Sequence, residues 1–152
     1  MLTFYKLFCF LNYPIWVFVL GLRRLKGKEH QERYREKLGY YKYNRPQNEV
    51  IWINSLGLGE TLSLTFFLEQ LSKHYPDKTL LLTSSTLQSQ IALENIPLGD
   101  NIVHQFAPVD NYKALKRFFD HWDPKIALFS ELDISPLRVS EVKKRKTPIL
   151  LI

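Results

Sequence analysis

The sequence predicts an α/β domain in which helices cover both faces of a doubly wound parallel sheet. Three observations lead to this fold class. Short apolar runs recur five times between residues 49 and 152, and stretches with helical character separate them. Nearly every residue within the runs is apolar, as in parallel strands that are buried on both faces. Regular alternation of such strands with helices is typical of a doubly wound sheet.

The expected strands share a short, β-branched or leucine-rich core. The first, VIWIN, ends in a loop with two glycines, and the pattern returns in LLLTSS, NIVHQF, KIALFS and PILLI. We therefore predict strands at 50–54, 80–85, 101–106, 125–130 and 148–152. The helices between them are predicted at 60–74, 87–95, 111–121 and 136–146. His74 and His121 are expected near helix ends, and Pro136 suits the first position of the last helix.

Composition and charge exclude several classes of protein. With 45% hydrophobic and 24% charged residues, the chain is not disordered throughout. Its single cysteine excludes a disulfide framework and any multi-cysteine metal site. Residues 1–48 hold 10 Lys and Arg against 3 Asp and Glu, whereas residues 49–152 hold 11 against 12. Because the positive excess is confined to the first third, the whole domain is not expected to wrap a polyanion.

Residues 1–22 have the composition of a membrane anchor. Residues 7–22 contain no charge, and seven of the first 22 residues are aromatic. The run is slightly shorter than the span of about 20 apolar residues that crosses a bilayer, and Pro14 interrupts it. A short span and an embedded interfacial helix are therefore both open. Four cations follow the run, which argues against a cleaved signal peptide and places the downstream chain in the cytoplasm.

Residues 23–48 are predicted as a basic juxtamembrane segment. Between 23 and 45 there are nine Lys and Arg, three Glu and four Tyr. Each cation near an anionic leaflet contributes about 1 kcal/mol to membrane binding. One alternative is a solvated helix face that follows a buried core helix. A second is nucleic-acid binding, because the basic residues alternate with aromatic ones. We favour a membrane partner and expect no nucleic acid.

The turn after the first strand carries the candidate catalytic residue. In doubly wound sheets, ligands bind beyond the carboxyl ends of the strands. There Gly57 and Gly59 allow a tight turn and close approach to a ligand, and Glu60 falls near a helix N-terminus. The helix dipole favours a carboxylate at this position by roughly 0.3–1 kcal/mol. Glu60 could then take a proton from a bound hydroxyl, or it could simply be a favourable first-turn residue.

Other polar residues follow the later strands. Glu131 and Asp133 come after the fourth strand, where they either contact a ligand or, with Asp133 or Ser135 as the cap, begin the next helix. Asp110 could likewise contact a ligand or cap the predicted helix 111–121. The spacing G-x-G-x-x-G of a dinucleotide site is not met. No metal site is expected, because no ligand spacing connects the four histidines, His30, His74, His104 and His121.

These turns, in this order, resemble the N-terminal half of 3-deoxy-D-manno-octulosonic acid (Kdo) transferases. Residues 54–60 match the family pattern H-S-x-S-x-G-E and keep Ser55, Gly59 and Glu60. Residues 74–77 match the end of its first helix. Its P-x-D, D-P-K and E-T-E-L-W-P elements are matched by residues 108–110, 123–125 and 131–136. Asn54, Gly57, residues 87–89, Asp133 and Ser135 depart from the pattern, which puts acceptor recognition in question.

The resemblance implies a Rossmann-like sheet, residues 49–152, that forms the acceptor half of a GT-B glycosyltransferase. It implies that Glu60 is the general base and that the acceptor is bound by Ser55, Gly57, Gly59, Asp110, Glu131 and Asp133. Kdo would pass from CMP-Kdo to a lipid A precursor at the cytoplasmic face of the inner membrane, without a cofactor or metal. The donor would bind mainly to a C-terminal half. Because the sequence ends at Ile152 within an expected strand, we expect a fragment that is inactive alone.

The alternative function comes from a different class. The altered turns and the missing donor half would also suit a non-catalytic, membrane-bound lipid-binding module or a degenerate paralogue.

Overall fold

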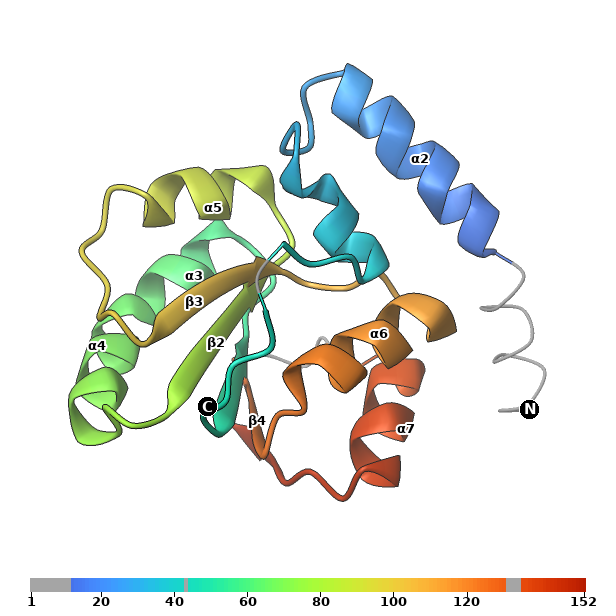
Figure 1. Ribbon diagram of the computed structural model, residues 1–152. Coiled ribbons are helices and arrows are strands. Elements are labelled where there is room, and N and C mark those ends of the chain that lie inside the picture. Colours follow the sequence, from blue (N-terminus) through green and yellow to red (C-terminus); the bar gives the residue numbers. More distant parts are fainter. Residues whose placement is uncertain (1–11, 43, 131–134) are drawn as a thin grey trace.

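The computed structural model describes residues 12–42, 44–130 and 135–152. Figure 1 shows a parallel sheet with helices on both of its faces. The strands are β1 (Val50–Asn54), β2 (Thr79–Ser84), β3 (Ile102–Phe106), β4 (Ile126–Phe129) and β5 (Ile149–Leu151). The helices are α2 (Tyr13–Leu25), the 3-10 helix η1 (Arg33–Leu38), α3 (Leu58–Ser63), α4 (Thr65–His74), α5 (Leu87–Leu93), α6 (Tyr112–Trp122) and α7 (Pro136–Lys144).

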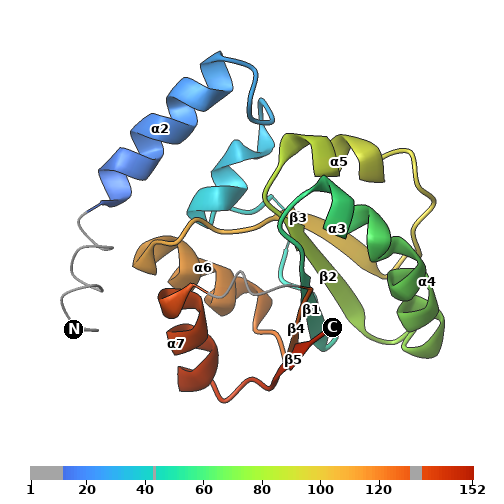
Figure 2. The same cartoon turned by 180° about the vertical axis from the view of Figure 1, so that it is seen from behind.

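The strand order confirms the predicted fold class. The sheet runs β3-β2-β1-β4-β5, and every neighbouring pair is parallel. Helices α3, α4 and α5 cover one face, while α6 and α7 cover the other (Figure 2). The five strands lie within two residues of their predicted bounds. The predicted helix 60–74 is interrupted at Leu64, so that α3 and α4 follow one another.

The two faces of the sheet have different cores. On the α6 and α7 face the core is aromatic, with Trp52 packed against Phe118, Phe119 and Phe129 at ring-centroid distances of 4.9–5.5 Å. The buried indole N–H of Trp52 donates to Thr83 Oγ1 at 2.8 Å, which satisfies its polar end. On the α3 and α4 face the core is aliphatic, with side chains from β1, β2 and α4. Both faces are buried, as the apolar runs predicted.

The predicted anchor, residues 1–22, falls partly on helix α2 and partly outside the described residues. In the part of the chain that the structure describes, no helix has both the length and the apolar character that crossing a bilayer requires. Helix α2 instead packs against the domain through its inner face, on which Leu20 is buried. Two side-chain hydrogen bonds to α6 fix its start: Asn111 donates to Asn12 at 3.0 Å, and Arg117 donates to Tyr13 at 2.8 Å.

Part of the predicted basic juxtamembrane segment, residues 23–48, is built into the domain. Arg33 pairs with Glu36 at 2.8 Å, and Glu36 also accepts the backbone N–H of Phe106 on β3. Lys37 is buried and pairs with buried Glu29 at 2.5 Å. The glutamates of the segment neutralise these two cations internally because a buried charge without a partner is costly. The Lys37 side chain is therefore enclosed by the domain, whereas that of Arg33 stays 24% exposed.

Candidate active site

The carboxyl edge of the sheet offers a ligand site between β1 and β4. The chain winds from β1 toward β3 across one face and then returns to β4, so that β1 and β4 are the strands where the order reverses. In open α/β sheets, ligands bind in the crevice outside this point. The turn from β1 into α3 and Ser130 after β4 both lie there. Ser130 is tied to β1, because its backbone N–H donates to the carbonyl of Asn54 at 3.2 Å.

Glu60 projects into this switch point. It is the third residue of α3, after Gly57 at the helix cap. Its Oε2 accepts the backbone N–H of Leu56 at 2.5 Å and the hydroxyl of Ser130 at 3.2 Å. The side chain is partly exposed, and no described residue hydrogen bonds to its Oε1. Glu60 therefore combines a fixed position with one carboxylate oxygen that has no donor among the described residues, which suits a proton acceptor.

Ser130 is a site residue that the sequence analysis missed. Its hydroxyl lies within hydrogen-bond distance of two oxygens, Glu60 Oε2 and the carbonyl of Asn54, each at 3.2 Å. Ser130 is the first residue after β4, the strand that neighbours β1, and this position would have identified it if the strand order had been known. The sequence alone does not give the strand order.

Ser55, a predicted acceptor contact, has a buried side chain. Ser55 is 1% exposed, and its hydroxyl is 2.8 Å from Thr61 Oγ1 and 3.0 Å from the carbonyl of Thr83. Its side chain therefore joins the turn to α3 and β2, and its role as an acceptor contact stays a prediction.

Gly57 and Gly59 lie on the open side of the same turn. Gly57 has an extended backbone, with φ −116° and ψ −177°, and Gly59 lies within α3. Because neither has a positive φ, the tight-turn argument for these glycines is wrong. No atom beyond the neighbouring residues lies within 4 Å of a Cβ added at either position, so the space beside both is open. Close approach of a ligand to this backbone stays a prediction.

The acidic residues after β3 and β4 are only partly described. Asn111, and not Asp110, caps α6, because its side chain accepts the N–H groups of Lys113 and Ala114. Asp110 instead accepts the hydroxyl of Ser135 at 2.6 Å. Ser135 caps α7, which confirms one of the two caps predicted there. Glu131 and Asp133 lie outside the described residues, so their role as acceptor contacts stays a prediction.

A chain of hydrogen bonds connects Glu60 with the basic segment. Leu56, whose N–H contacts Glu60, accepts the backbone N–H of Ser85 at 3.1 Å. The carbonyl of Ser85 accepts Lys37 Nζ at 2.9 Å. Burial lowers the pKa of Lys37, an effect that the hydrogen bond and charge of Glu29 oppose. Lys37 belongs to the predicted juxtamembrane segment, and the structure places it beside the carboxyl end of β2.

A cavity of about 330 Å³ lies between α2 and this edge of the sheet. One wall comes from α2 and the other from the loop after β3. The lining residues are Trp16, Val19, Leu20, Arg23, Glu29, Lys37, Ser85, Ala107, Pro108, Val109, Asp110 and Arg138. Asp110 is the one predicted acceptor residue among them. The cavity is connected to Glu60 through Ser85 and Leu56.

His104 is a buried titratable residue near this edge. Arg33 can only donate, so its contact with His104 Nδ1 at 3.3 Å makes that nitrogen an acceptor. Nε2 then carries the proton and donates to Ser84 Oγ at 2.8 Å. Burial lowers the pKa of His104 to about 3, and the positive charge of Arg33 acts in the same direction. A neutral His104 therefore fastens η1 to β3. Within the described ranges, no group of three or more His, Cys, Asp or Glu side chains is placed to hold a metal ion.

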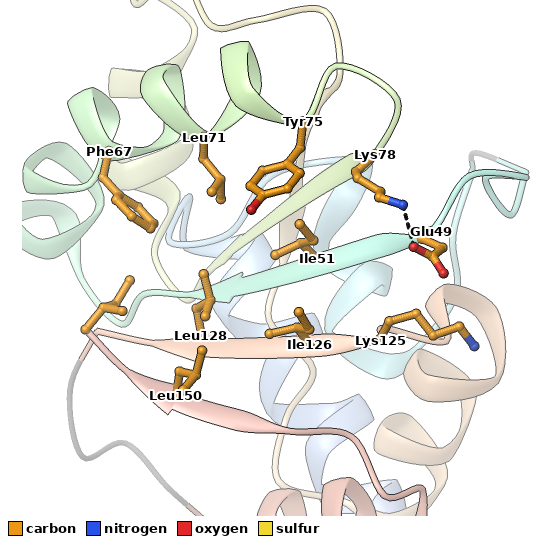
Figure 3. A pocket seen from close by; sticks show the side chains of 11 residues that line it. Glu49, Ile51, Phe67, Leu71, Tyr75, Lys78, Lys125, Ile126, Leu128 and Leu150 are labelled. Atoms are coloured by element: carbon orange, nitrogen blue, oxygen red, sulfur yellow. Dashed lines mark hydrogen bonds and ion pairs between the residues drawn. The ribbon is translucent and has the colours of Figure 1, made fainter.

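A second cavity lies away from the switch point. Figure 3 shows an apolar groove in which side chains of α4 face those of the sheet. Its volume is about 370 Å³, and its lining includes Phe67, Leu71, Tyr75, Ile51, Ile126, Leu128 and Leu150. The ion pair between Lys78 and Glu49, at 2.5 Å, marks the amino ends of the strands. Its described lining includes neither Glu60 nor the residues that hydrogen bond to Glu60.

Comparison with known proteins decides the family. Residues 32–152 match the sequence model of a family described as 3-deoxy-D-manno-octulosonic-acid transferase (kdotransferase). The chain belongs to this family. The match begins at Glu32 and includes η1, the whole sheet and the turn with Glu60, which confirms the resemblance seen in the motifs.

Several relatives carry the same name. The chain is 30% identical over 151 residues to a 3-deoxy-D-manno-octulosonic acid transferase of Rickettsia bellii, a match that covers 99% of this chain and 36% of the relative. It is 32% identical over 136 residues to a probable mitochondrial enzyme of that name from Arabidopsis thaliana. This match covers 87% of this chain and 30% of the relative. For the Haemophilus influenzae transferase the identity is 24% over 149 residues, and the match covers 97% of this chain and 35% of the relative. The chain thus spans about a third of the length of these relatives. No solved structure matches it.

Proposed function

We propose that this chain is the acceptor-binding half of a Kdo transferase and that Glu60 is its general base. The observation that carries the proposal is the position of Glu60. Its carboxylate lies at the switch point of the sheet, held by Leu56 N–H and Ser130, with its second oxygen free of described partners. Membership of the Kdo transferase family supports the reaction class.

The proposed reaction is an inverting transfer of Kdo from CMP-Kdo to a lipid A precursor. An acceptor hydroxyl gives its proton to Glu60 while its oxygen bonds to the anomeric carbon of Kdo. The bond from that carbon to the CMP phosphate oxygen breaks, and CMP leaves with the electron pair. In a GT-B arrangement the donor binds mainly to the part of the relatives that this chain does not span. No cofactor or metal takes part in this scheme.

The second candidate is a membrane-bound lipid-binding module without transfer activity. The altered turn residues Asn54 and Gly57 favour it, because they change the motif beside Glu60. The two candidates differ in one observable. The enzyme forms a Kdo-linked lipid, whereas the module binds lipid and leaves CMP-Kdo unchanged.

Substitution of Glu60 tests the proposal in the full-length protein. Glu60→Gln keeps the size of the side chain but removes the proton acceptor. Since general-base catalysis contributes about 10²–10⁴-fold, turnover should fall by that factor. Glu69→Gln is the matched control, because Glu69 is an exposed carboxylate on α4 that pairs only with Lys73 among the described residues. Normal transfer by Glu60→Gln, or no transfer by the wild-type protein, would refute the catalytic role.

We also propose that the N-terminal region attaches the protein to the cytoplasmic face of the inner membrane. The exposed apolar face of α2 and the exposed cations at its end support an interfacial attachment. Deletion of residues 1–22 should release much of the protein from membranes. The remaining binding should weaken as salt rises, because exposed charges are screened over roughly 10 Å at 0.1 M. Retention of the truncated protein regardless of salt would contradict the electrostatic part.

A further inference from the structure

Asn54 is a buried polar residue whose side chain keeps a donor without a partner among the described residues. It is 3% exposed, and in the register of the sheet it lies between Thr83 of β2 and Phe129 of β4. Figure 2 shows β1 in this central position. Asn54 Oδ1 accepts the hydroxyl of Thr83 at 2.9 Å, whereas no described residue hydrogen bonds to Nδ2. Since buried polar groups are nearly always paired, this unused donor needs a physical explanation.

Two hydrogen bonds in series fix which way the Asn54 amide is turned. The indole N–H of Trp52 donates to Thr83 Oγ1 at 2.8 Å, and an indole nitrogen can only donate. The Thr83 hydroxyl must then give its own hydrogen to another acceptor. Asn54 Oδ1, at 2.9 Å, is closer to it than the carbonyl of Ile53, at 3.4 Å. The oxygen end of the amide therefore faces Thr83, which leaves the NH₂ end, with its two N–H groups, for another partner.

This donor belongs to the edge of the sheet that carries Glu60. The backbone carbonyl of Asn54 accepts both the N–H and the hydroxyl of Ser130, each at 3.2 Å. The same hydroxyl lies 3.2 Å from Glu60 Oε2. Asn54 is also the last residue of β1, one of the two strands between which the strand order reverses. Because ligands of open α/β sheets bind outside this point, a ligand there can meet the carboxylate of Glu60 and the amide of Asn54 together.

The chemistry of an amide nitrogen narrows the choice of ligand. The NH₂ group can only donate, so its partner is an acceptor, and sugars present several hydroxyl and ring oxygens that can accept. The amide is neutral as well. It can therefore orient a sugar oxygen without adding a positive charge that would pair with the Glu60 carboxylate.

We propose that Asn54 is a substrate-contact residue, whose amide N–H donates to an oxygen of a sugar bound at the switch point. Thr83 is then a positioning residue that acts through Asn54, and Trp52 holds Thr83 in turn. The proposal rests on the proposed function, because it takes the bound sugar to be a substrate of Kdo transfer. The oxygen belongs either to the acceptor or to the Kdo group of the donor, and binding measurements distinguish these two sources.

Binding of each substrate alone tests the contact separately from catalysis. The full-length protein is titrated with CMP-Kdo in the absence of acceptor, and with a lipid A precursor in the absence of donor. Asn54→Asp keeps the size of the side chain and an acceptor for Thr83 but removes both N–H groups. It should weaken the binding of one substrate by about tenfold, which corresponds to about 1.4 kcal/mol for one hydrogen bond. The substrate that is affected identifies the source of the oxygen. Unchanged binding of both substrates, or equal weakening of both, would overturn the contact.

Companion variants separate the contact from charge and from folding. Asn54→Leu, which has neither charge nor donor, should weaken the same substrate as Asn54→Asp, whereas Asn54→His supplies a ring N–H and should bind it nearly as well as the wild-type protein. Thr83→Val keeps the shape of the side chain but removes the hydroxyl that orients the amide, so it should also weaken that substrate. Thr79→Val is the matched control, because Thr79 is a buried threonine at the amino end of the same strand. Weak binding by Asn54→His, or equal effects of the two threonine substitutions, would overturn the proposal in favour of a structural role.

Glu60→Gln distinguishes a failure of this proposal from a failure of the proposed function. If Glu60→Gln keeps its transfer activity while Asn54→Asp loses binding, the general base is wrong and the Asn54 contact stands. If Asn54→Asp binds both substrates normally while Glu60→Gln loses transfer, the contact is wrong and the general base stands.

Discussion

Acidification should destabilise the protein through His104. The pKa of this buried imidazole is lowered from 6.5 to about 3 in the folded protein, so the folded state binds fewer protons than the unfolded state. The stability that the neutral His104 contributes is therefore fully present above pH 6.5 and is lost as the pH falls toward 3. Each pH unit within this window costs about 1.4 kcal/mol, which gives roughly 2 kcal/mol at pH 5. Few carboxylates titrate above pH 5, so the imidazole should dominate there.

Urea unfolding at pH 7, 6 and 5 measures this effect. The wild-type free energy of unfolding should decline by roughly 2 kcal/mol over that range. His104→Gln, which stays neutral, should show a much flatter profile even if it is less stable at pH 7. His74→Gln is the control, because His74 lies exposed at the end of α4 and should leave the profile unchanged. A flat wild-type profile, or the same slope in His104→Gln, would refute the argument from burial.

Three other substitutions test the packing and the site. Lys37→Met should cost about 3 kcal/mol in urea unfolding, because it breaks a buried pair with Glu29; no loss would show that the pair is dispensable. Asn111→Ala should cost about 0.5–2 kcal/mol as α6 loses its cap, while Asn111→Asp should retain most of the stability. Ser130→Ala should lower turnover by about tenfold with little change in acceptor KM, since a lost hydrogen bond to the Glu60 carboxylate is worth about 1.5 kcal/mol; unchanged turnover would remove Ser130 from the site.

The sheet was predictable because each strand is apolar on nearly every residue. That pattern identified all five strands, and alternation with helices identified their parallel arrangement. The break between α3 and α4 at Leu64 was not predictable, because no glycine or proline marks it. The 3-10 helix η1 was also missed, since its charged sequence has the composition of an exposed segment. Tertiary contacts with β3 decide its structure, and such contacts leave no local signal.

The candidate site was predictable only in part. Glu60 could be placed because it follows the first strand at a helix N-terminus. The burial of Ser55 and the role of Ser130 depend on which strands are neighbours, and sequence periodicity does not give that order. The burial of Lys37 was not predictable for a similar reason, since it forms a buried pair with Glu29 and both residues look solvated in the sequence. Charge counts describe a segment, whereas the fold decides which charges reach solvent.

Chemical rescue of Glu60→Ala tests the central claim most directly. The substitution removes the proposed base and leaves a small space beside Leu56 and Ser130. In the full-length protein, its rate of Kdo transfer should fall by about 10²–10⁴-fold. Added formate, a small carboxylate, should restore part of that rate in a saturable way and should not stimulate the wild-type protein. A rate for Glu60→Ala within tenfold of wild type, or a lost rate that formate does not raise at any concentration, would contradict the assignment of Glu60 as the general base.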